Sequence, residues 1–333
     1  MTIEIIAELA QGFEGKAEQA SLLLKAAAAA GADAAKFQLV YADELATPDY
    51  KYHGLFTSLE MKDEQWSELR SLAEKLNVRL YLDVFGTRSL RLAEKLAVST
   101  VKLHGTDIAN RGFLEHIAAS KIPRILLGAG GAMLGELQQA LKVLSRKEVV
   151  VLAGFQGYPT PNGTNQIARV RKLIDVLGRS HPQVAIGFAD HAPPDSPLRH
   201  ALAASALGAG ATVLEKHLTL GKVMKMEDHE AALNPDEFLE FCQIVRACHE
   251  AMGVVTDADD FGMSQSEYDY RKMIRRHVVA GQDLPSGCRL APNHLVLKRT
   301  SSDQVLTDLE SVYGKTLDRA VAGNTPIPRD GIH

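Results

Sequence analysis

Two histidines stand at the ends of two apolar runs in the middle of the chain. His191 follows the run 184–190 and His217 follows the run 211–216, with a helix-like stretch between them. Such short apolar runs are typical of buried parallel strands, whose carboxyl ends lie at one edge of a sheet or barrel. Neutral imidazoles placed there suit manganese, zinc or iron, with a carboxylate completing the ligand set. The pair therefore predicts a metal site.

Further charged residues follow apolar runs, where packing alone does not require them. The carboxylates of Glu8, Asp83 and Asp228 are candidates for a third metal ligand. Lys36 and Lys102 are expected to face the same opening, where an ammonium group attracts a carboxylate or a phosphate. Asp107 is a further catalytic candidate, and the substrate-binding candidates at this rim are Gln38, Asp83, Gln156, Tyr158 and Asp228.

Eight apolar runs alternate with eight helix-like stretches up to about residue 254, a pattern of the α/β class. Strands are predicted at 4–9, 34–39, 78–84, 100–103, 124–127, 149–152, 184–188 and 212–215. Helices are predicted at 16–30, 62–76, 87–96, 112–119, 134–144, 167–177, 196–207 and 235–252. Eight strand-then-helix units in about 250 residues match a TIM (β/α)8 barrel. The main rival, an open doubly wound sheet, usually needs fewer units.

The barrel pattern stops near Gly253, so residues 1–255 are assigned to the barrel. Residues 256–270 are polar and acidic and predict a linker or exposed loop. In residues 271–333, short apolar runs are broken by proline and glycine. This last segment predicts a small β-rich domain.

Bulk composition excludes several classes of protein. The chain has 333 residues, of which 46% are hydrophobic, and a net charge of −4, so no general attraction to nucleic acid is expected. The sequence contains no run of about 18 apolar residues, so no membrane span is predicted. The amino terminus lacks the basic flank and apolar stretch of a signal peptide. A cytoplasmic protein that acts on small molecules is the expectation.

Several motifs occur in order along nearly the whole chain. They are Ile6-Ala7-Glu8, the segment 31–38, Tyr158-Pro159-Thr160-Pro161, Asp190-His191, Glu215-Lys216-His217 and Asn234-Pro235-Asp236. Together they resemble the sialic acid synthase family, which includes N-acetylneuraminate, legionaminate and pseudaminate synthases. The tail, with Asp283 to Gly287 and the pair Lys298-Arg299, is similar to the antifreeze-like (SAF) domain that family members carry.

This resemblance implies a reaction and a cofactor. Such enzymes condense phosphoenolpyruvate with an N-acylated sugar aldehyde, forming a carbon–carbon bond and an α-keto sugar acid. The resemblance places a divalent metal, usually Mn²⁺, on His191 and His217, where it would polarise the aldehyde as a Lewis acid. Glu8 is the implied proton-transfer residue, and Lys36 and Lys102 are the implied ligands of the anionic donor.

The resemblance also implies an acceptor site and an assembly. Gln38 and Asp228 would contact the hydroxyl groups of the sugar. Arg299 would reach the acyl group of the acceptor in a neighbouring subunit, because family members form homodimers that exchange their tail domains.

The chain departs from the family around the donor, where members use small hydroxyl and amide side chains. Asp83 lies in the segment 82–85, where the family usually has a Ser-Thr-Pro-Phe type sequence. Gly105 and Gly128 stand where serines are usual, and Ala189 replaces the serine that usually precedes Asp190. A hydrogen bond to a charged group contributes about 1.5–3 kcal/mol, so losing several weakens phosphate binding. Asp83 adds repulsion unless a metal or Lys36 neutralises it. The interpretation is a divergent member with a rebuilt donor site.

Three functions stay open at this stage. The first is a synthase that still uses phosphoenolpyruvate in a rearranged pocket. The second is a metal-dependent aldolase or lyase for an unphosphorylated keto acid, with Asp83 joining the histidines in a facial triad. The third is a non-catalytic sugar-acid binding protein, against which the retained metal and proton-transfer residues argue.

Overall fold

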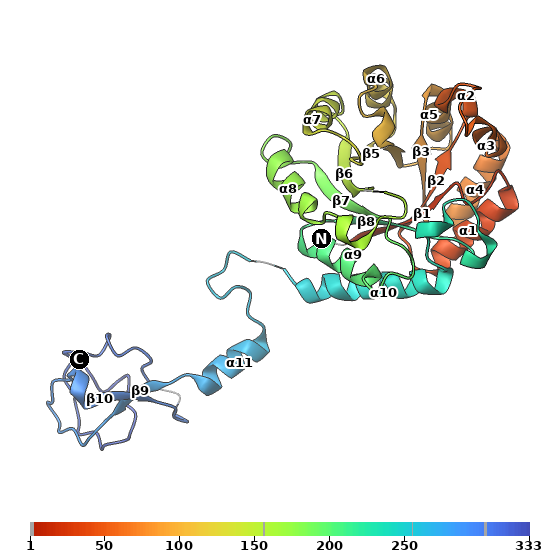
Figure 1. Ribbon diagram of the computed structural model, residues 1–333. Coiled ribbons are helices and arrows are strands. Elements are labelled where there is room, and N and C mark those ends of the chain that lie inside the picture. The colour runs from red at the N-terminus through yellow and green to blue at the C-terminus, as the bar shows by residue number, and fades with distance from the viewer. Residues whose placement is uncertain (1–2, 156, 255, 303–304) are drawn as a thin grey trace. The chain divides into compact units, whose positions relative to one another are not determined.

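The computed structural model describes residues 3–155, 157–254, 256–302 and 305–333. These residues form two compact units, Met1–Gly253 and Val254–His333. In Figure 1 the first unit is coloured from red to cyan and the second is blue.

Eight parallel strands close into a barrel in the first unit, because β8 pairs with β1 as well as with β7. The strands are β1 (Glu4–Ala10), β2 (Ala34–Leu39), β3 (Arg79–Val84), β4 (Thr100–Leu103), β5 (Arg124–Gly128), β6 (Glu148–Gly154), β7 (Ala185–Asp190) and β8 (Val213–His217). Each lies close to its predicted bounds. The predicted TIM barrel is therefore confirmed, and the open doubly wound sheet is excluded.

Helices form a ring around the strands, as Figure 1 shows. The eight predicted helices are α1 (Ala17–Ala29), α4 (Asp63–Lys75), α5 (Thr87–Lys95), α6 (Arg111–Ala119), α7 (Leu134–Val143), α8 (Ala168–Leu177), α9 (Arg199–Gly208) and α10 (Pro235–Met252). The start of α9 was predicted too early, because the Ser196 hydroxyl accepts a hydrogen bond from the Leu198 amide and holds a turn there. In the described part of the chain, no helix is long and apolar enough to span a bilayer.

The loops at the carboxyl ends of the strands contain short helices that the periodicity did not predict. Between β2 and α4 lie α2 (Ala42–Leu45) and α3 (His53–Ser58), which are too short to show a helical repeat. One 3₁₀ turn follows β4, one follows β6 and two follow β8; they are η1 (Gly105–Asp107), η2 (Asn162–Thr164), η3 (Lys222–Met224) and η4 (His229–Ala231).

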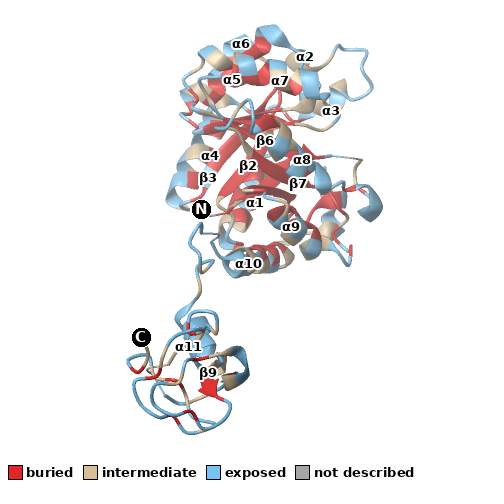
Figure 2. Ribbon diagram, turned by 90° about the vertical axis from the view of Figure 1, so that its left-hand side faces the viewer, coloured by how far each residue is buried: buried red, intermediate tan, exposed pale blue. Residues whose placement is uncertain are grey.

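Alternate side chains along each strand face either the helices or the interior of the barrel. In β1, Ile5 and Leu9 pack in the core between sheet and helices, whereas Ile6 faces inward. The apolar interior consists of Ile6, Ala34, Tyr81, Leu126, Val150, Leu152, Ala189 and Val213. Figure 2 shows these central strands buried and the outer helix surfaces exposed. Glu8 is the next inward residue after Ile6, so a carboxylate stands where the apolar interior ends.

The second unit has a small core of its own around a two-stranded antiparallel sheet. Its elements are α11 (Gln265–Ile274), β9 (His277–Ala280), η5 (Pro292–His294) and β10 (Leu295–Lys298). The core includes Val278, Leu295 and Ile327. The segment predicted as a linker contains the start of α11, because Ser264 caps this helix by accepting a hydrogen bond from the Glu267 amide. The assignment of the second unit as an antifreeze-like domain stays a prediction.

Candidate active site

Five charged side chains meet inside the barrel, above the apolar interior. They are Glu8 from β1, Lys36 from β2, Asp83 from β3, Lys102 from β4 and Glu215 from β8, and they are called the lysine cluster below. The strand register brings them together: Glu8 lies opposite Lys36, and Asp83 lies opposite Lys102. All five are buried. Charged groups at such depth need partners, and each lysine finds its partners within the cluster.

Lys36 lies at the centre of the lysine cluster and is fully buried. Its ammonium group donates hydrogen bonds to Glu8 and, at 2.6 Å, to Asp83, and lies 3.5 Å from Glu215. Lys102 donates to Glu215 at 2.6 Å and lies 3.8 Å from Glu8 and 4.0 Å from Asp83. Both lysines predicted to hold an anionic donor are therefore already paired with carboxylates of the chain.

Three carboxylates share two ammonium groups, so one proton balances the lysine cluster. Burial raises the pKa of Glu8 to about 8, with Glu215 and Asp83 raising it further and Lys36 and Lys102 opposing the rise. For Glu215, burial is outweighed by Lys102 and Lys36, which lower its pKa. Glu8 is thus the carboxyl that holds the proton near neutral pH, and the cluster is then uncharged.

The two histidines lie together at the mouth of the barrel. The ring centroids of His191 and His217 are 5.2 Å apart, and the Tyr158 ring lies 6.0 Å from the first and 5.5 Å from the second. Burial, with a smaller contribution from Lys102, lowers the pKa of His191 to about 4. Burial and His191 lower the pKa of His217 well below its usual value. Both imidazoles are neutral at pH 7, which is the form that binds a metal.

The histidine pair fits a divalent cation that takes its other ligands from water or substrate. The Nδ1 atom of His191 lies 3.1 Å from the Ala189 carbonyl oxygen, which leaves Nε2 as the ligand atom. No group of three His, Cys, Asp or Glu side chains within the described residues has the arrangement of a metal site.

The carboxylates considered as a third ligand are engaged elsewhere. Glu8 and Asp83 bind Lys36, and Asp228 accepts a hydrogen bond from the Gln11 amide at 3.1 Å. The described residues do not form the facial triad considered for Asp83 and the two histidines, since this carboxylate binds the Lys36 ammonium at 2.6 Å.

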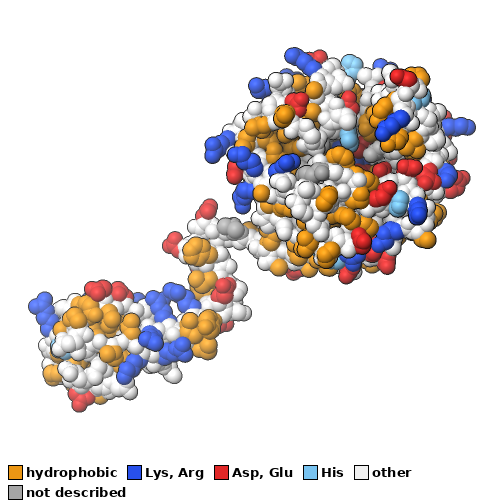
Figure 3. All heavy atoms as spheres, viewed as in Figure 1, with side chains coloured by type: hydrophobic (Ala, Val, Ile, Leu, Met, Phe, Trp, Pro, Cys, Tyr) orange, Lys and Arg blue, Asp and Glu red, His pale blue; other side chains and the backbone are white. Residues whose placement is uncertain are grey.

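A cavity of about 620 Å³ opens above β1 to β4 and is called the outer cavity. Gln38 and Asp107 lie on its wall, and Gln38 accepts a hydrogen bond from Gln11 at 2.8 Å. Its lining mixes polar and apolar side chains; the residues are Gln11, Gln38, Glu44, Leu45, Ala46, Thr47, Tyr50, Phe56, Phe85, His104, Thr106 and Asp107. In Figure 3 acidic and histidine side chains border the hollowed face of this unit. The volume and mixed lining suit a small polar molecule.

A second cavity of about 40 Å³, the inner cavity, lies between Lys102 and His191. This cavity is much smaller than the outer cavity. Its other lining residues are His104, Gly105, Gly128, Gly130, Leu152, Gly154, Phe155 and Ala189. A Cβ atom on Gly105 would lie 2.5 Å from the Gly130 carbonyl oxygen, and one on Gly154 would lie 2.2 Å from that of Ala189. The strand ends that carry hydroxyl groups in the family here pack backbone against backbone.

The loop after β8 contacts both Tyr158 and the opening loop. The Tyr158 hydroxyl donates to the Asp228 carbonyl oxygen, and the Asp228 backbone is left-handed, with φ 62°. Burial raises the pKa of the Asp228 carboxyl to about 6. Tyr158 and Asp228 therefore form one wall of the mouth.

Two candidates lie outside this group, and a third is not described. Asp107 lies in η1 on the outer cavity and not in the lysine cluster. Gln156 lies outside the described residues. Arg299 belongs to the second unit, where its Nε donates to the Ile274 carbonyl oxygen at 3.2 Å.

The sequence interpretation missed Glu215 and Gln11 as site residues. The signal for Glu215 was available, since residues two apart in a strand share a face and Glu215 precedes His217 by two. Lys216, between them, points the other way and binds Asp190 at 3.2 Å. Gln11 lies in a loop, and nothing in its neighbourhood marks it.

Comparison with known proteins gives a consistent picture. The model of the NeuB family matches residues 23–257. The chain is 29% identical to the N,N'-diacetyllegionaminic acid synthase of Campylobacter jejuni, over 93% of this chain and 94% of that protein. It is 25% identical to the protein of the same name from Legionella pneumophila, over 98% of this chain and 94% of the relative.

A solved structure has the same fold. It is described as a putative spore coat polysaccharide biosynthesis protein E from Chromobacterium violaceum. The two chains superpose with a TM-score of 0.83, cover each other completely and share 20% identity.

Proposed function

This chain belongs to the NeuB family, and on that premise we propose that it joins an enolpyruvate-type donor to an N-acylated sugar aldehyde. The membership confirms the predicted kinship with the sialic acid synthases and the prediction of a synthase-type enzyme. The proposed reaction forms one carbon–carbon bond and yields an α-keto sugar acid. With phosphoenolpyruvate as donor, water adds to the enolpyruvate and inorganic phosphate leaves. The relatives named as legionaminic acid synthases support this reaction class.

One juxtaposition carries the proposal. Two neutral imidazoles, 5.2 Å apart, stand at the mouth of a barrel whose interior holds the lysine cluster. A divalent cation bound to His191 and His217, for which we propose Mn²⁺, supplies Lewis-acid polarisation of the aldehyde. The carboxyl group that holds a proton lies directly opposite on the neighbouring strand, since Glu8 pairs with His217 across β1 and β8. Polarisation and proton transfer are the two demands of an aldol-type step.

The chain's own side chains take the following proposed roles. Glu8, whose pKa is raised to about 8, holds the proton that is exchanged with the reacting centre. Lys102, at the border of the inner cavity, attracts the acidic end of the donor. Gln38 and Asp107, on the wall of the outer cavity, bind hydroxyl groups of the sugar. Tyr158 packs against both imidazoles and keeps them oriented.

A second candidate is a metal-dependent aldolase or lyase for an unphosphorylated keto acid. Two observations favour it. Asp83 binds Lys36 at 2.6 Å and adds a third carboxyl group below the donor site. The inner cavity offers no side-chain hydroxyl group to a phosphate among its described lining residues. The third possibility, a protein that only binds sugar acids, gains nothing from either observation.

A coupled assay separates the two candidates. Wild-type protein is incubated with Mn²⁺, phosphoenolpyruvate and a panel of N-acetylhexosamines, and released phosphate is measured. Phosphate release that is lost in His217→Ala and retained in His200→Ala, a histidine on α9, supports the synthase. No release with any acceptor, together with metal-dependent cleavage of a keto sugar acid, contradicts it and supports the lyase.

We further propose that the second unit is an antifreeze-like domain and that Arg299 acts in the site of a neighbouring subunit of a cytoplasmic homodimer. The small antiparallel sheet and the Lys298-Arg299 pair support this. The test is a mixture of two inactive variants, Arg299→Ala and His217→Ala. Exchanged tails would restore one complete site in each mixed dimer, so activity would return. A mixture that stays inactive contradicts the exchange.

A further inference from the structure

His104 occupies a position between the two cavities of the barrel mouth. It follows β4, two residues after Lys102, and so lies on the same inward face. Among the described residues that line the cavities, His104 is the one that borders both. A molecule bound in either cavity therefore lies beside this residue.

The inner cavity offers few polar side chains to a substrate. Among its described lining residues only Lys102, His104 and His191 carry one, and the others are glycine, alanine, leucine or phenylalanine. Lys102 is already bound to Glu215 at 2.6 Å. His191 is a proposed metal ligand. Lys102 therefore attracts an anionic group by its charge, and His104 is the remaining described side chain of this cavity that can donate a hydrogen bond to that group.

The immediate surroundings of His104 leave it able to donate a hydrogen bond. Its Nδ1 atom lies 3.5 Å from the Thr106 hydroxyl, and its ring centroid lies 6.2 Å from that of Phe85. Burial, followed by Lys102, lowers the pKa of His104, so the ring is neutral at pH 7. A neutral imidazole has one N–H donor and one acceptor nitrogen. In the tautomer in which Nδ1 accepts from the Thr106 hydroxyl, Nε2 carries the N–H group and can donate it to a substrate.

We propose that His104 positions the donor of the proposed reaction by donating a hydrogen bond to its carboxylate, at the passage between the inner and outer cavities. This assignment rests on the proposed function. It gives the chain a substitute for the hydroxyl groups that Gly105, Gly128 and Ala189 lack.

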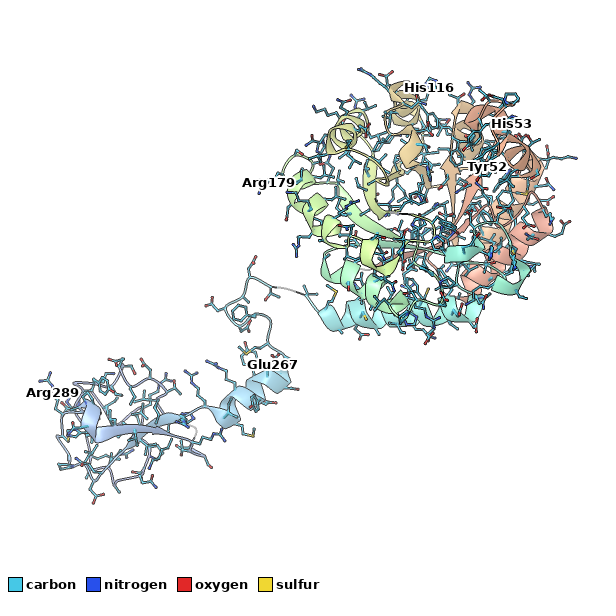
Figure 4. All side chains as sticks on the ribbon, in the orientation of Figure 1. Tyr52, His53, His116, Arg179, Glu267 and Arg289 are labelled. Atoms are coloured by element: carbon cyan, nitrogen blue, oxygen red, sulfur yellow. The ribbon has the colours of Figure 1, made fainter. Side chains whose placement is uncertain are left out.

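The test compares His104→Ala, His104→Gln and a control, His116→Ala. His116 is an exposed histidine on α6, labelled in Figure 4. KM for the donor and for the sugar are measured separately with the donor that the wild-type enzyme uses. His104→Ala should raise the KM for the donor about tenfold to hundredfold, the effect of losing a hydrogen bond to a charged group. The KM for the sugar should change much less, and His104→Gln, which keeps an N–H donor, should recover part of the loss.

A binding experiment keeps this inference separate from the proposed reaction. Phosphoenolpyruvate and pyruvate are titrated into wild-type protein, His104→Ala and His116→Ala in the presence of Mn²⁺. Weaker binding of either acid to His104→Ala alone supports the role of His104, even if no turnover is found and the proposed reaction fails. Equal binding to wild-type protein and His104→Ala, or no binding of either acid to the wild type, overturns it. A rise in the KM for the sugar alone would also overturn it.

Discussion

The Asp83 carboxylate lies 2.6 Å from the Lys36 ammonium nitrogen inside the barrel, and neither side chain is open to solvent. Removing two ions from water is costly, and this pair offsets the cost only through its mutual attraction and the further partners Glu8 and Glu215. The pair therefore determines both the charge below the donor site and the stability of the barrel.

Replacing Asp83 with serine should strengthen phosphoenolpyruvate binding. The effect is expected above about pH 8, where Glu8 has lost its proton and the wild-type lysine cluster has three carboxylates against two ammonium groups; the change removes this excess negative charge, so binding is compared at pH 9. The expected gain in affinity is about tenfold, since one nearby charge in a partly screened site is worth roughly 1–2 kcal/mol. Titration calorimetry measures it, with Asp175→Asn, an exposed change on α8, as the control. Weaker binding by Asp83→Ser would show that the carboxylate serves the donor directly.

Replacing Lys36 with methionine should destabilise the first unit. The change leaves three carboxylates with one ammonium group in a buried site, and breaking such a pair costs about 3–5 kcal/mol. Urea unfolding followed by the fluorescence of Trp66 reports on this unit, because Trp66 is the single tryptophan of the chain and is buried there. Lys16→Met, which removes an exposed ion pair with Glu14, should cost less than about 1 kcal/mol. Similar losses in the two variants would refute the buried-charge argument.

Glu8 should make the stability of the first unit fall as pH rises. Its pKa is raised to about 8 in the folded protein, against an ordinary value of about 4.3, so the folded state holds one more proton between these values. The free energy of unfolding then decreases over this range by as much as about 1.4 kcal/mol per pH unit. Glu8→Gln, which cannot titrate, should lack this component when unfolding is measured from pH 5 to 8. The exposed change Glu18→Gln should keep the wild-type slope, and an unchanged slope in Glu8→Gln would rule out the protonated carboxyl.

Gly154 should not tolerate a side chain. Its φ is +139°, and an added Cβ would lie 2.2 Å from the Ala189 carbonyl oxygen, so the ends of β6 and β7 would have to separate. Gly154→Ala is expected to cost more than about 2 kcal/mol, in the range of strained or overpacked sites. Gly135→Ala, in α7 with open space around the added atom, should instead stabilise by about 0.5–1 kcal/mol. Thermal unfolding of the two variants measures the contrast, which would be absent if the inner wall could relax.

The barrel and the histidine pair could be predicted because both depend on short-range pattern. An apolar run indicates a strand, and the residue at the end of the run lies at the mouth of the barrel, as His191 and His217 show. Helix α10 was predicted at its observed bounds, because Pro235 suits a first turn and Gly253 ends the periodicity.

The partners of each charge could not be predicted in this way. Asp83 was expected near a metal, but the register of β2, β3 and β4 places it between Lys36 and Lys102. Register between strands that are distant in the chain is a property of the closed barrel and leaves little trace in any one segment. The glycine-lined inner cavity likewise depends on four strand ends meeting, which no local spacing records.

The pairing of Glu8 with His217 across β1 and β8 has a consequence for biosynthesis. Glu8 is among the earliest residues to leave the ribosome, and His217 follows more than 200 positions later. One edge of β1 stays unpaired until β8 has been synthesised. Closing the barrel by this long-range pairing slows folding and favours misassembly. A truncated nascent chain that lacks β8 would possess neither a sealed cylinder nor any catalytic capacity.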